Sequence, residues 1–186
     1  MFSSAKDDHM DHNRTNRVLL VPIGEIPDGL MDWLAPRLEA KLGVQVDKGN
    51  PIEPPEDAWD SERRQFRGEK LLSYLGRAKS HLKDRVVGLI DSDSYSNGLN
   101  FIFGQAEVHG RNALVALPRL RPDLVETPDD IGRFYSRVLK EVIHELGHTW
   151  GIPHCPDHTC VMHFSNRLAD TDLKGESFCQ SCQNRL

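Results

Sequence analysis

Three histidines and one glutamate lie within the eleven residues HELGHTWGIPH, which run from His144 to His154. His144 and His148 are four residues apart, so on a helix their imidazoles project from one face and can bind the same metal ion. Catalytic zinc sites typically have three protein ligands and leave the fourth position to water. We expect His154 to be the third ligand, because Gly151 lets the backbone leave the helix sharply and bring that histidine back to the metal.

Glu145 lies beside the histidine pair and is the expected general base. Zinc lowers the pKa of water from about 15.7 to about 7 and polarises a carbonyl group. Glu145 would accept the proton of the attacking water and deliver it to the leaving amine, so the pattern predicts hydrolysis of peptide bonds. A bare HExxH motif occurs by chance in many proteins, but the glycine and the third histidine at fixed spacing favour a metal site.

Three alternatives to this interpretation remain open. A distant carboxylate could supply the third ligand, from Asp170, Asp172 or Glu176, although His154 makes this unnecessary. A hydrolase of small non-peptide amides would share the same zinc chemistry. A catalytically latent zinc-binding module, whose cysteine-containing tail mediates interactions, would not need Glu145, and the presence of that residue therefore favours an enzyme.

All four cysteines follow the histidine motif, as the local pairs Cys155 with Cys160 and Cys179 with Cys182. The first sixteen residues are polar and lack the apolar core of a secretion signal. In such a chain, local cysteine pairs more often bind zinc in a reducing compartment than form disulfides. We therefore expect a cytoplasmic protein.

Length and charge restrict the partners of the chain. Its 186 residues suit one domain, and a net charge of -5 with a pI near 6.0 argues against binding to nucleic acid. The apolar run at residues 18–23 is far too short to span a bilayer. We expect a monomer that acts on peptide or protein substrates, with no nucleic-acid or membrane partner.

The order of apolar segments before the motif predicts an α/β fold with mainly parallel strand pairing. Strands are expected at residues 18–23, 44–47 and 85–91, and helices at residues 30–42 and 69–82. Gly43 should end the first helix, and Pro36 should either kink it or start its regular part.

A β-hairpin is expected next, from residues 100–108 and 111–118, and it could supply an antiparallel edge strand. Thr127, followed by proline and two aspartates, predicts the start of a helix over residues 128–150 that stops at Gly151. This helix carries the first two histidines. The loop 119–127 or the amino-terminal arm could cover the site and keep it latent.

HELGHTWGIPH, followed by the cysteines and Met162, resembles the archaemetzincins, a metzincin family of zinc metalloproteases with an additional cysteine cluster. The likeness includes NFIFGQAE at residues 100–107 and HFSN at residues 163–166, and it spans at least residues 100–182. One departure is the interval of sixteen residues between Met162 and Cys179, which is one residue shorter than in the family pattern. A loop deletion of this size should be tolerated.

The resemblance implies a role for each motif residue. It makes Glu145 the general base and Met162 the methionine of the turn beneath the metal. It implies two zinc ions, one catalytic and one structural. The catalytic ligands would be His144, His148 and His154, and the structural ligands Cys155, Cys160, Cys179 and Cys182. A tail of about thirty residues cannot build its own core, and four thiolates on zinc can fold it.

The resemblance also implies a metzincin-like fold: a twisted, mostly parallel sheet with an antiparallel edge strand, backing helices and an active-site helix. An edge strand, for which residues 101–117 are the candidate, would accept an extended peptide along the cleft, although these apolar residues could equally belong to the core. We expect residues 1–16 to be a disordered arm or tag, and residues 17–151 to form the α/β subdomain with the active-site helix. Residues 152–186 would form a small irregular zinc-bound subdomain.

Other polar residues near the motif have simpler explanations. Tyr135 and Lys174 could stabilise an oxyanion, but we expect Lys174 to be solvated and Tyr135 to pack beside Ile131, Phe134 and Val138. His158 and His163 could bind metal, but four thiolates complete a tetrahedral shell and both histidines are expected at the surface. Asp91 and Asp93 are expected in a loop at the end of a strand rather than in a cation site.

Overall fold

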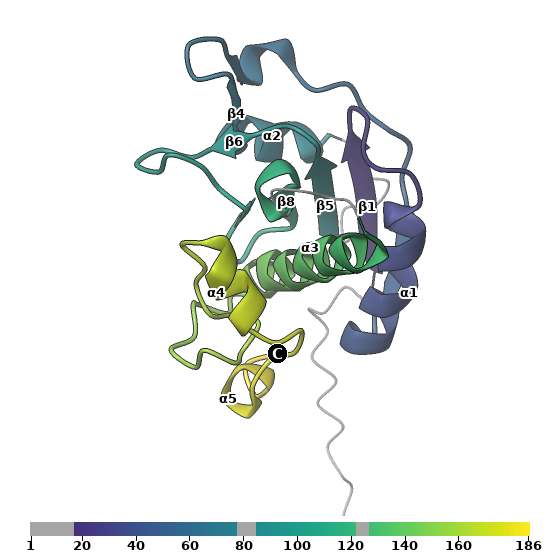
Figure 1. Ribbon diagram of the computed structural model, residues 1–186, viewed down its shortest axis with the longest axis vertical. Coiled ribbons are helices and arrows are strands. Elements are labelled where there is room, and N and C mark those ends of the chain that lie inside the picture. The colour runs from purple at the N-terminus through teal and green to yellow at the C-terminus, as the bar shows by residue number, and fades with distance from the viewer. Residues whose placement is uncertain (1–16, 78–84, 122–126) are drawn as a thin grey trace, which may run out of the picture.

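A five-stranded sheet forms the centre of the computed structural model, which describes residues 17–77, 85–121 and 127–186 (Figure 1). The strand order is β2-β1-β5-β8-β7. The strands are β1 (Arg17–Ile23), β2 (Gln45–Lys48), β5 (Arg85–Ile90), β7 (Gly104–Ala106) and β8 (Asn112–Ala116). β2, β1, β5 and β8 pair in parallel, and β7 pairs antiparallel with β8 at one edge. This arrangement confirms the predicted mixed sheet with an antiparallel edge strand.

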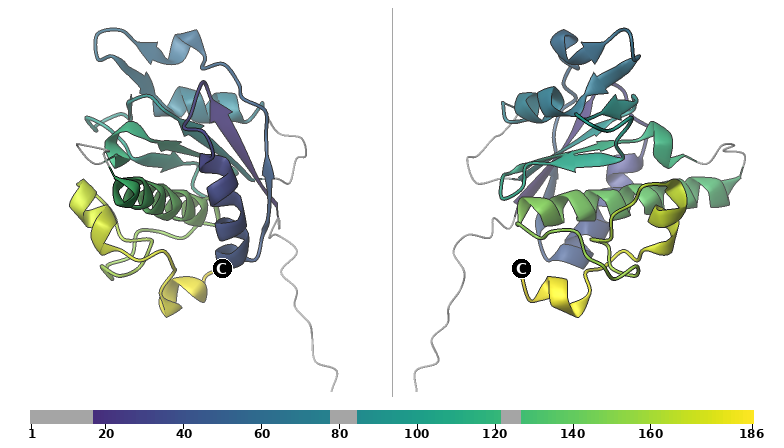
Figure 2. Two further views of the ribbon diagram at one scale, coloured as in Figure 1. Left: turned by 45° about the vertical axis from the view of Figure 1, so that its right-hand side comes forward. Right: turned by 90° about the vertical axis from the view of Figure 1, so that its left-hand side faces the viewer.

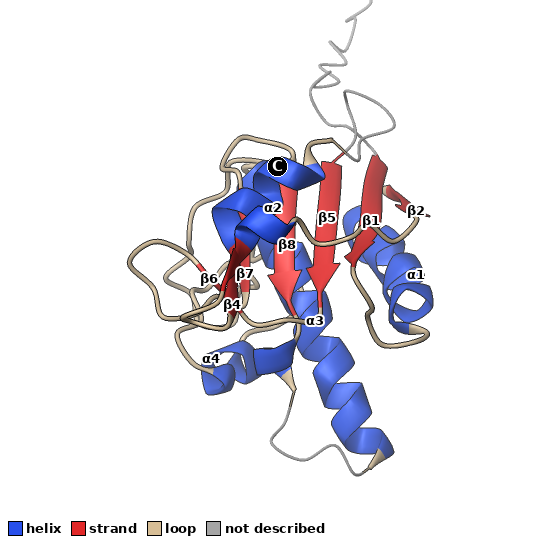
Figure 3. Ribbon diagram, turned by 90° about the horizontal axis from the view of Figure 1, so that it is seen from above, coloured by secondary structure: helices blue, strands red, loops and turns tan. Residues whose placement is uncertain are grey.

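Helices cover both faces of this sheet (Figures 2 and 3). α1 (Leu30–Leu42) and α3 (Pro128–Thr149) lie on one face, and α2 (Gly68–Leu75) lies on the other. In β5, Val87 and Leu89 belong to the core under α1 and α3, whereas Val86 and Ile90 belong to the core under α2. Because alternate residues of a strand point to opposite faces, both faces of β5 require apolar residues.

Pro36 neither starts the regular part of α1 nor interrupts it, because the helix begins six residues earlier at Leu30. Proline cannot donate the hydrogen bond that would close on the carbonyl of Asp32. Both Asp32 and Pro36 are exposed, so water can satisfy that carbonyl. α1 ends at Gly43, whose φ of 65° is in the left-handed region, as the sequence predicts.

A second, small sheet was missed by the sequence reasoning. It contains β3 (Trp59–Asp60), β4 (Gln65–Arg67) and β6 (Ser94–Tyr95), and a short 3-10 turn, η1 (Glu56–Ala58), precedes it. Strands of two or three residues show no hydrophobic period. The buried Gln65 amide secures this sheet by donating to Asp93 Oδ2 and to the Asn100 carbonyl, both at 2.9 Å.

α3 begins as predicted at Thr127, whose hydroxyl accepts from the backbone N–H of Asp130 in a capping box. A 3-10 turn, η2 (Pro118–Leu120), follows β8. After α3, a tail with α4 (Leu168–Leu173) and α5 (Gln180–Gln183) lies on the side of α3 that faces away from the sheet (Figure 2). The predicted second helix ends at Leu75, and part of its expected extension lies outside the described residues. Among the described helices, none is long and apolar enough to cross a membrane.

Candidate metal centres

The end of α3 has the hydrogen bonds of a Schellman motif. The backbone N–H of Ile152 donates to the carbonyl of Gly147 at 3.0 Å, and that of Gly151 donates to the carbonyl of His148 at 2.9 Å. Gly151 adopts a φ of 85°, which a residue with a side chain rarely tolerates. The chain therefore reverses at the position that the sequence indicated, and it carries His154 back toward the helix.

The imidazoles of His144, His148 and His154 converge. The Nε2 atom of His148 lies 3.1 Å from that of His144 and 3.2 Å from that of His154. Two nitrogens on one tetrahedral zinc ion, each at about 2.0–2.1 Å from the metal, would lie about 3.3 Å apart. The three nitrogens are thus close to the separation that a shared metal ion requires.

Backbone carbonyls orient two of these rings. His144 Nδ1 lies 2.8 Å from the Val161 oxygen, and His148 Nδ1 lies 2.8 Å from the Ile152 oxygen. A carbonyl only accepts, so each Nδ1 carries the hydrogen and each Nε2 keeps a free lone pair. Metal-binding histidines commonly have this arrangement.

The surroundings also keep the three imidazoles neutral. Burial is the main cause that lowers the pKa of His144 and His148, and the charge of Lys174 adds to it. Partial burial, with a further contribution from His148, lowers the pKa of His154 to about 4. Neutral imidazole is the form that binds a metal ion, so the donor set fits zinc at neutral pH.

Glu145 is buried, 4% exposed, and its carboxylate lines a cleft of about 340 Å³ in front of the histidines. The cleft lies between residues 99–106, which include β7, and residues 164–166 in the tail. Burial raises the pKa of Glu145 well above its ordinary value, and the neighbouring Glu141 raises it further, while Lys174 lowers it. A carboxyl group with a raised pKa is suited to exchanging protons near neutral pH.

Gly104 in β7 makes room for the Glu145 side chain. A Cβ atom at position 104 would lie 2.5 Å from Glu145 Oε1, closer than real Cβ contacts allow. Gly147 has the same relation to Met162, since its Cβ would lie 2.4 Å from the Met162 sulfur. Met162 is fully buried against the turn of α3 that contains His144 and His148. The absence of a side chain at both positions lets functional groups approach the backbone.

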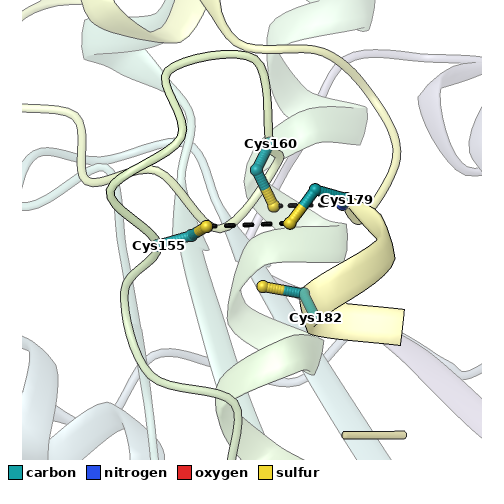
Figure 4. A group of neighbouring side chains, drawn as sticks. All are labelled: Cys155, Cys160, Cys179 and Cys182. Atoms are coloured by element: carbon teal, nitrogen blue, oxygen red, sulfur yellow. Dashed lines mark hydrogen bonds between the residues drawn. The ribbon is translucent and has the colours of Figure 1, made fainter. Parts of the chain in front are cut away.

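The four cysteines gather in the tail (Figure 4). Their Sγ atoms all lie within 4.8 Å of one another. The Cys155 and Cys179 sulfurs are 3.8 Å apart, which is about the separation of two thiolates on a tetrahedral zinc ion with bonds of about 2.3 Å. All four are free thiols.

The environment of these thiols also fits a divalent cation. Burial raises the pKa of Cys160 and Cys182, whereas hydrogen bonds, first from the Cys182 backbone, lower the pKa of Cys179. Four neighbouring thiolates repel one another unless a cation neutralises them, and a bound metal ion holds thiols in the ionised form. The cluster is therefore able to hold zinc.

The three carboxylates considered as alternative zinc ligands are engaged elsewhere. Asp170 Oδ2 accepts from the backbone N–H of Asn166 and of Arg167, and Asp172 pairs with Arg137. Glu176 pairs with Lys41 at 2.9 Å and accepts from Ser136. Neither metal-binding group in the described residues contains any of the three.

Two expectations about packing were wrong. Lys174 is not solvated: it is fully buried and its Nζ lies 2.8 Å from Glu141 Oε1. Ile131 is 46% exposed and does not pack inward, although Phe134 and Val138 do. Tyr135 packs edge-on against Trp33 and does not line the cleft.

Asp91 and Asp93 follow β5 and form ion pairs with Arg121 and Arg119, with N–O distances of 2.5 and 2.6 Å. This agrees with the expected loop at the end of a strand. The arginine guanidinium groups neutralise both carboxylates.

Glu141 also lines the cleft, and sequence reasoning did not identify it. Its position, one turn before Glu145 on the same helix face, was the available signal, because residues four apart on a helix are neighbours. Gly104 and Gly147 were missed as well. A glycine inside a strand or helix pattern indicates a close approach, but it does not identify the group that approaches.

Comparisons with known proteins by family model, by sequence and by structure agree on one family. The model of peptidase family M54 matches residues 41–186. The chain is 39% identical over 175 residues to an archaemetzincin of Pyrococcus abyssi, covering 91% of this chain and 93% of the relative. The crystal structure of an archaemetzincin from Methanopyrus kandleri aligns with a TM-score of 0.79 at 40% identity, covering 90% and 91% of the two chains. One from Archaeoglobus fulgidus, complexed with malonate, aligns with a TM-score of 0.80 at 30% identity, covering 91% and 99%.

Proposed function

The chain belongs to peptidase family M54, the archaemetzincins, and is a zinc metallopeptidase; we propose that His144, His148 and His154 hold its catalytic zinc, with Glu145 as the general base. One observation carries this proposal: three imidazole Nε2 atoms converge beside a buried carboxylate that lines an open cleft. A latent binding module would need neither the carboxylate nor the cleft, and family membership does not favour it.

The chemistry needs little beyond these residues. Zinc bound there supplies a Lewis acid, which polarises a peptide carbonyl and lowers the pKa of water from about 15.7 to about 7. Glu145 accepts the proton from the water that attacks the carbonyl carbon. When the carbon–nitrogen bond breaks, Glu145 donates this proton to the leaving amine and returns to its starting state.

We propose that β7 aligns the substrate. It is the last strand on one side of the sheet, and residues 99–106 form a wall of the cleft. An extended peptide could pair with its outer edge and add a sixth strand. The pairing would bring the peptide past Glu145, which lies against Gly104.

The four cysteines are proposed to bind a second, structural zinc, giving two zinc ions per chain. The tail that contains them has only two short helices, of six and four residues, so a metal cross-link would contribute much of its stability.

We propose that residues 17–151 and residues 152–186 form two subdomains. We also propose a cytoplasmic monomer without nucleic-acid or membrane partners, supported by the free thiols and the negative net charge.

Metal analysis and one substitution test this function. The purified protein should contain two zinc ions per chain and should cleave members of a peptide library. Glu145→Gln should retain both ions and lose cleavage, because the amide cannot accept the proton. Glu62→Gln, at an exposed position, is the matched control and should be fully active. Cleavage that persists in Glu145→Gln would contradict the assigned role, and cleavage of small amides alone would contradict peptide specificity.

A further inference from the structure

A second pair of histidines lies outside both metal centres. His158 Nδ1 and His163 Nε2 are 3.0 Å apart, with the two rings inclined at 62°. The neighbouring pairs in the catalytic group have similar values: 3.1 and 3.2 Å between nitrogens, with rings inclined at 88° and 82°. The geometry of the second pair is thus close to that of two ligands of one metal ion.

His163 is oriented in the same manner as the catalytic ligands. Its Nδ1 lies 3.0 Å from the Cys155 carbonyl oxygen, so Nδ1 carries the hydrogen and Nε2 has a free lone pair. The Nδ1 atoms of His144 and His148 likewise each contact a backbone carbonyl oxygen. The lone pair of His163 is directed at His158, which is exposed to solvent.

We propose that His158 and His163 form a third metal site, which takes up a borderline transition-metal ion such as Zn²⁺ through His158 Nδ1 and His163 Nε2. Imidazole pairs suit zinc, copper and nickel, and they do not suit magnesium or calcium, which prefer oxygen ligands. Water fills the remaining positions, because the exposed side of the pair is open. With two protein ligands rather than three or four, this site is the weakest of the three.

The location gives the third ion a structural effect. His158 and His163 lie in the loop that contains Cys160 and Met162 and that begins just after His154. Two backbone hydrogen bonds already cross this loop. The N–H of Cys155 donates to the Met162 carbonyl, and the N–H of His163 donates to the Cys160 carbonyl, both at 2.9 Å. A metal ion on the two imidazoles cross-links the same loop from its outer side. Excess zinc should therefore stabilise the holoprotein.

The test is a calorimetric titration of Zn²⁺ into full-length protein that already holds two zinc ions per chain. A third equivalent should bind, and the melting temperature should rise with its occupancy. His158→Gln should weaken the third equivalent at least tenfold while leaving the first two ions and the peptidase activity unchanged. His163→Gln should weaken it equally.

His9→Gln combined with His12→Gln is the matched control, because these two histidines are also close together in sequence and belong to neither candidate metal centre. This double variant should bind the third equivalent like the original protein. The proposal is overturned if the original protein binds no third equivalent, if His158→Gln leaves that binding intact, or if the control variant loses it. Because none of these results depends on Glu145, the outcome is separate from that of the peptidase assay.

Discussion

Lys174 and Glu141 form an ion pair inside the protein, with Nζ and Oε1 2.8 Å apart and the side chains 0% and 4% exposed. Thr171 donates to the same Glu141 oxygen, and Lys174 Nζ also donates to the carbonyl of His163, next to Met162. The pair therefore connects α3 to the segment of the tail that contains Met162 and His163.

Removing one member of this pair should be costly. Lys174→Met leaves the Glu141 carboxylate buried without its counter-charge, and we expect a loss of roughly 3–5 kcal/mol in the free energy of unfolding. Lys174→Met combined with Glu141→Leu should recover most of that loss. Chemical denaturation of the holoprotein measures both.

A surface ion pair provides the control for Lys174. Lys70 Nζ lies 2.9 Å from Asp57 Oδ2, and both side chains are exposed. Lys70→Met should change stability by less than about 1 kcal/mol. An equal effect of Lys70→Met and Lys174→Met would show that burial of the pair does not matter.

Gly104→Ala should reduce catalysis with little effect on metal content. The added methyl group would occupy the space of the Glu145 carboxylate, and displacement of a catalytic group by about 1 Å can cost about 100-fold in rate. We expect kcat to fall by about that factor, while zinc analysis still finds the full complement.

Gly132→Ala is the matched glycine control. Nothing lies within 4 Å of a Cβ atom at this helical position. Alanine should stabilise the helix by roughly 0.5–1 kcal/mol and leave kcat unchanged. A normal kcat in Gly104→Ala would contradict the close contact between β7 and Glu145.

Cys182→Ser should remove one zinc ion per chain and destabilise the tail. The buried sulfur is one of four converging thiols, and loss of a ligand weakens the cross-link that holds α5 to the rest of the chain. We expect a loss of at least about 2 kcal/mol, or roughly 4–8 °C in Tm. Metal analysis and thermal denaturation measure the two effects, and Ser181→Ala, at the exposed neighbouring position, should show neither.

Asp172 should make stability depend on acidity. Hydrogen bonds from the buried Arg137, at 2.7 and 2.8 Å, hold the pKa of Asp172 below its ordinary value of 3.8. The unfolded chain therefore binds a proton more readily than the folded one, and the contribution of Asp172 is full above pH 3.8 and disappears as the pH falls through the lowered pKa.

The comparison of Asp172→Asn with the original protein isolates this effect. The variant should be less stable by roughly 1 kcal/mol near pH 6, because the carboxylate is partly exposed. Urea denaturation at a series of pH values should show this difference shrinking below pH 3.8. A difference that stays constant down to pH 3 would contradict the role of the ion pair.

The parts of the fold that could be predicted from the sequence are those with local causes. Thr127 and Gly151 define the ends of α3 through capping and a left-handed turn, and both effects involve residues close in the chain. The alternation of β5 between two cores produces a continuous apolar run that is recognisable by itself.

The features that could not be predicted depend on contacts between distant segments. Lys174 and Glu141 are 33 positions apart, and nothing near either residue indicates that a charge will be buried. Gly104 and Glu145 meet only because β7 lies at the edge of the sheet beside α3. Side-chain chemistry indicated which residues are candidates for metal binding and catalysis, but tertiary packing determined which residues surround them.

His154 and Cys155 are consecutive, yet their side chains belong to different ligand groups. A single peptide unit therefore joins the two ligand groups. An insertion or deletion of even one residue at this junction would shift one ligand group relative to the other. Over evolutionary time, the junction should vary least in length, and the two ligand groups should be retained together.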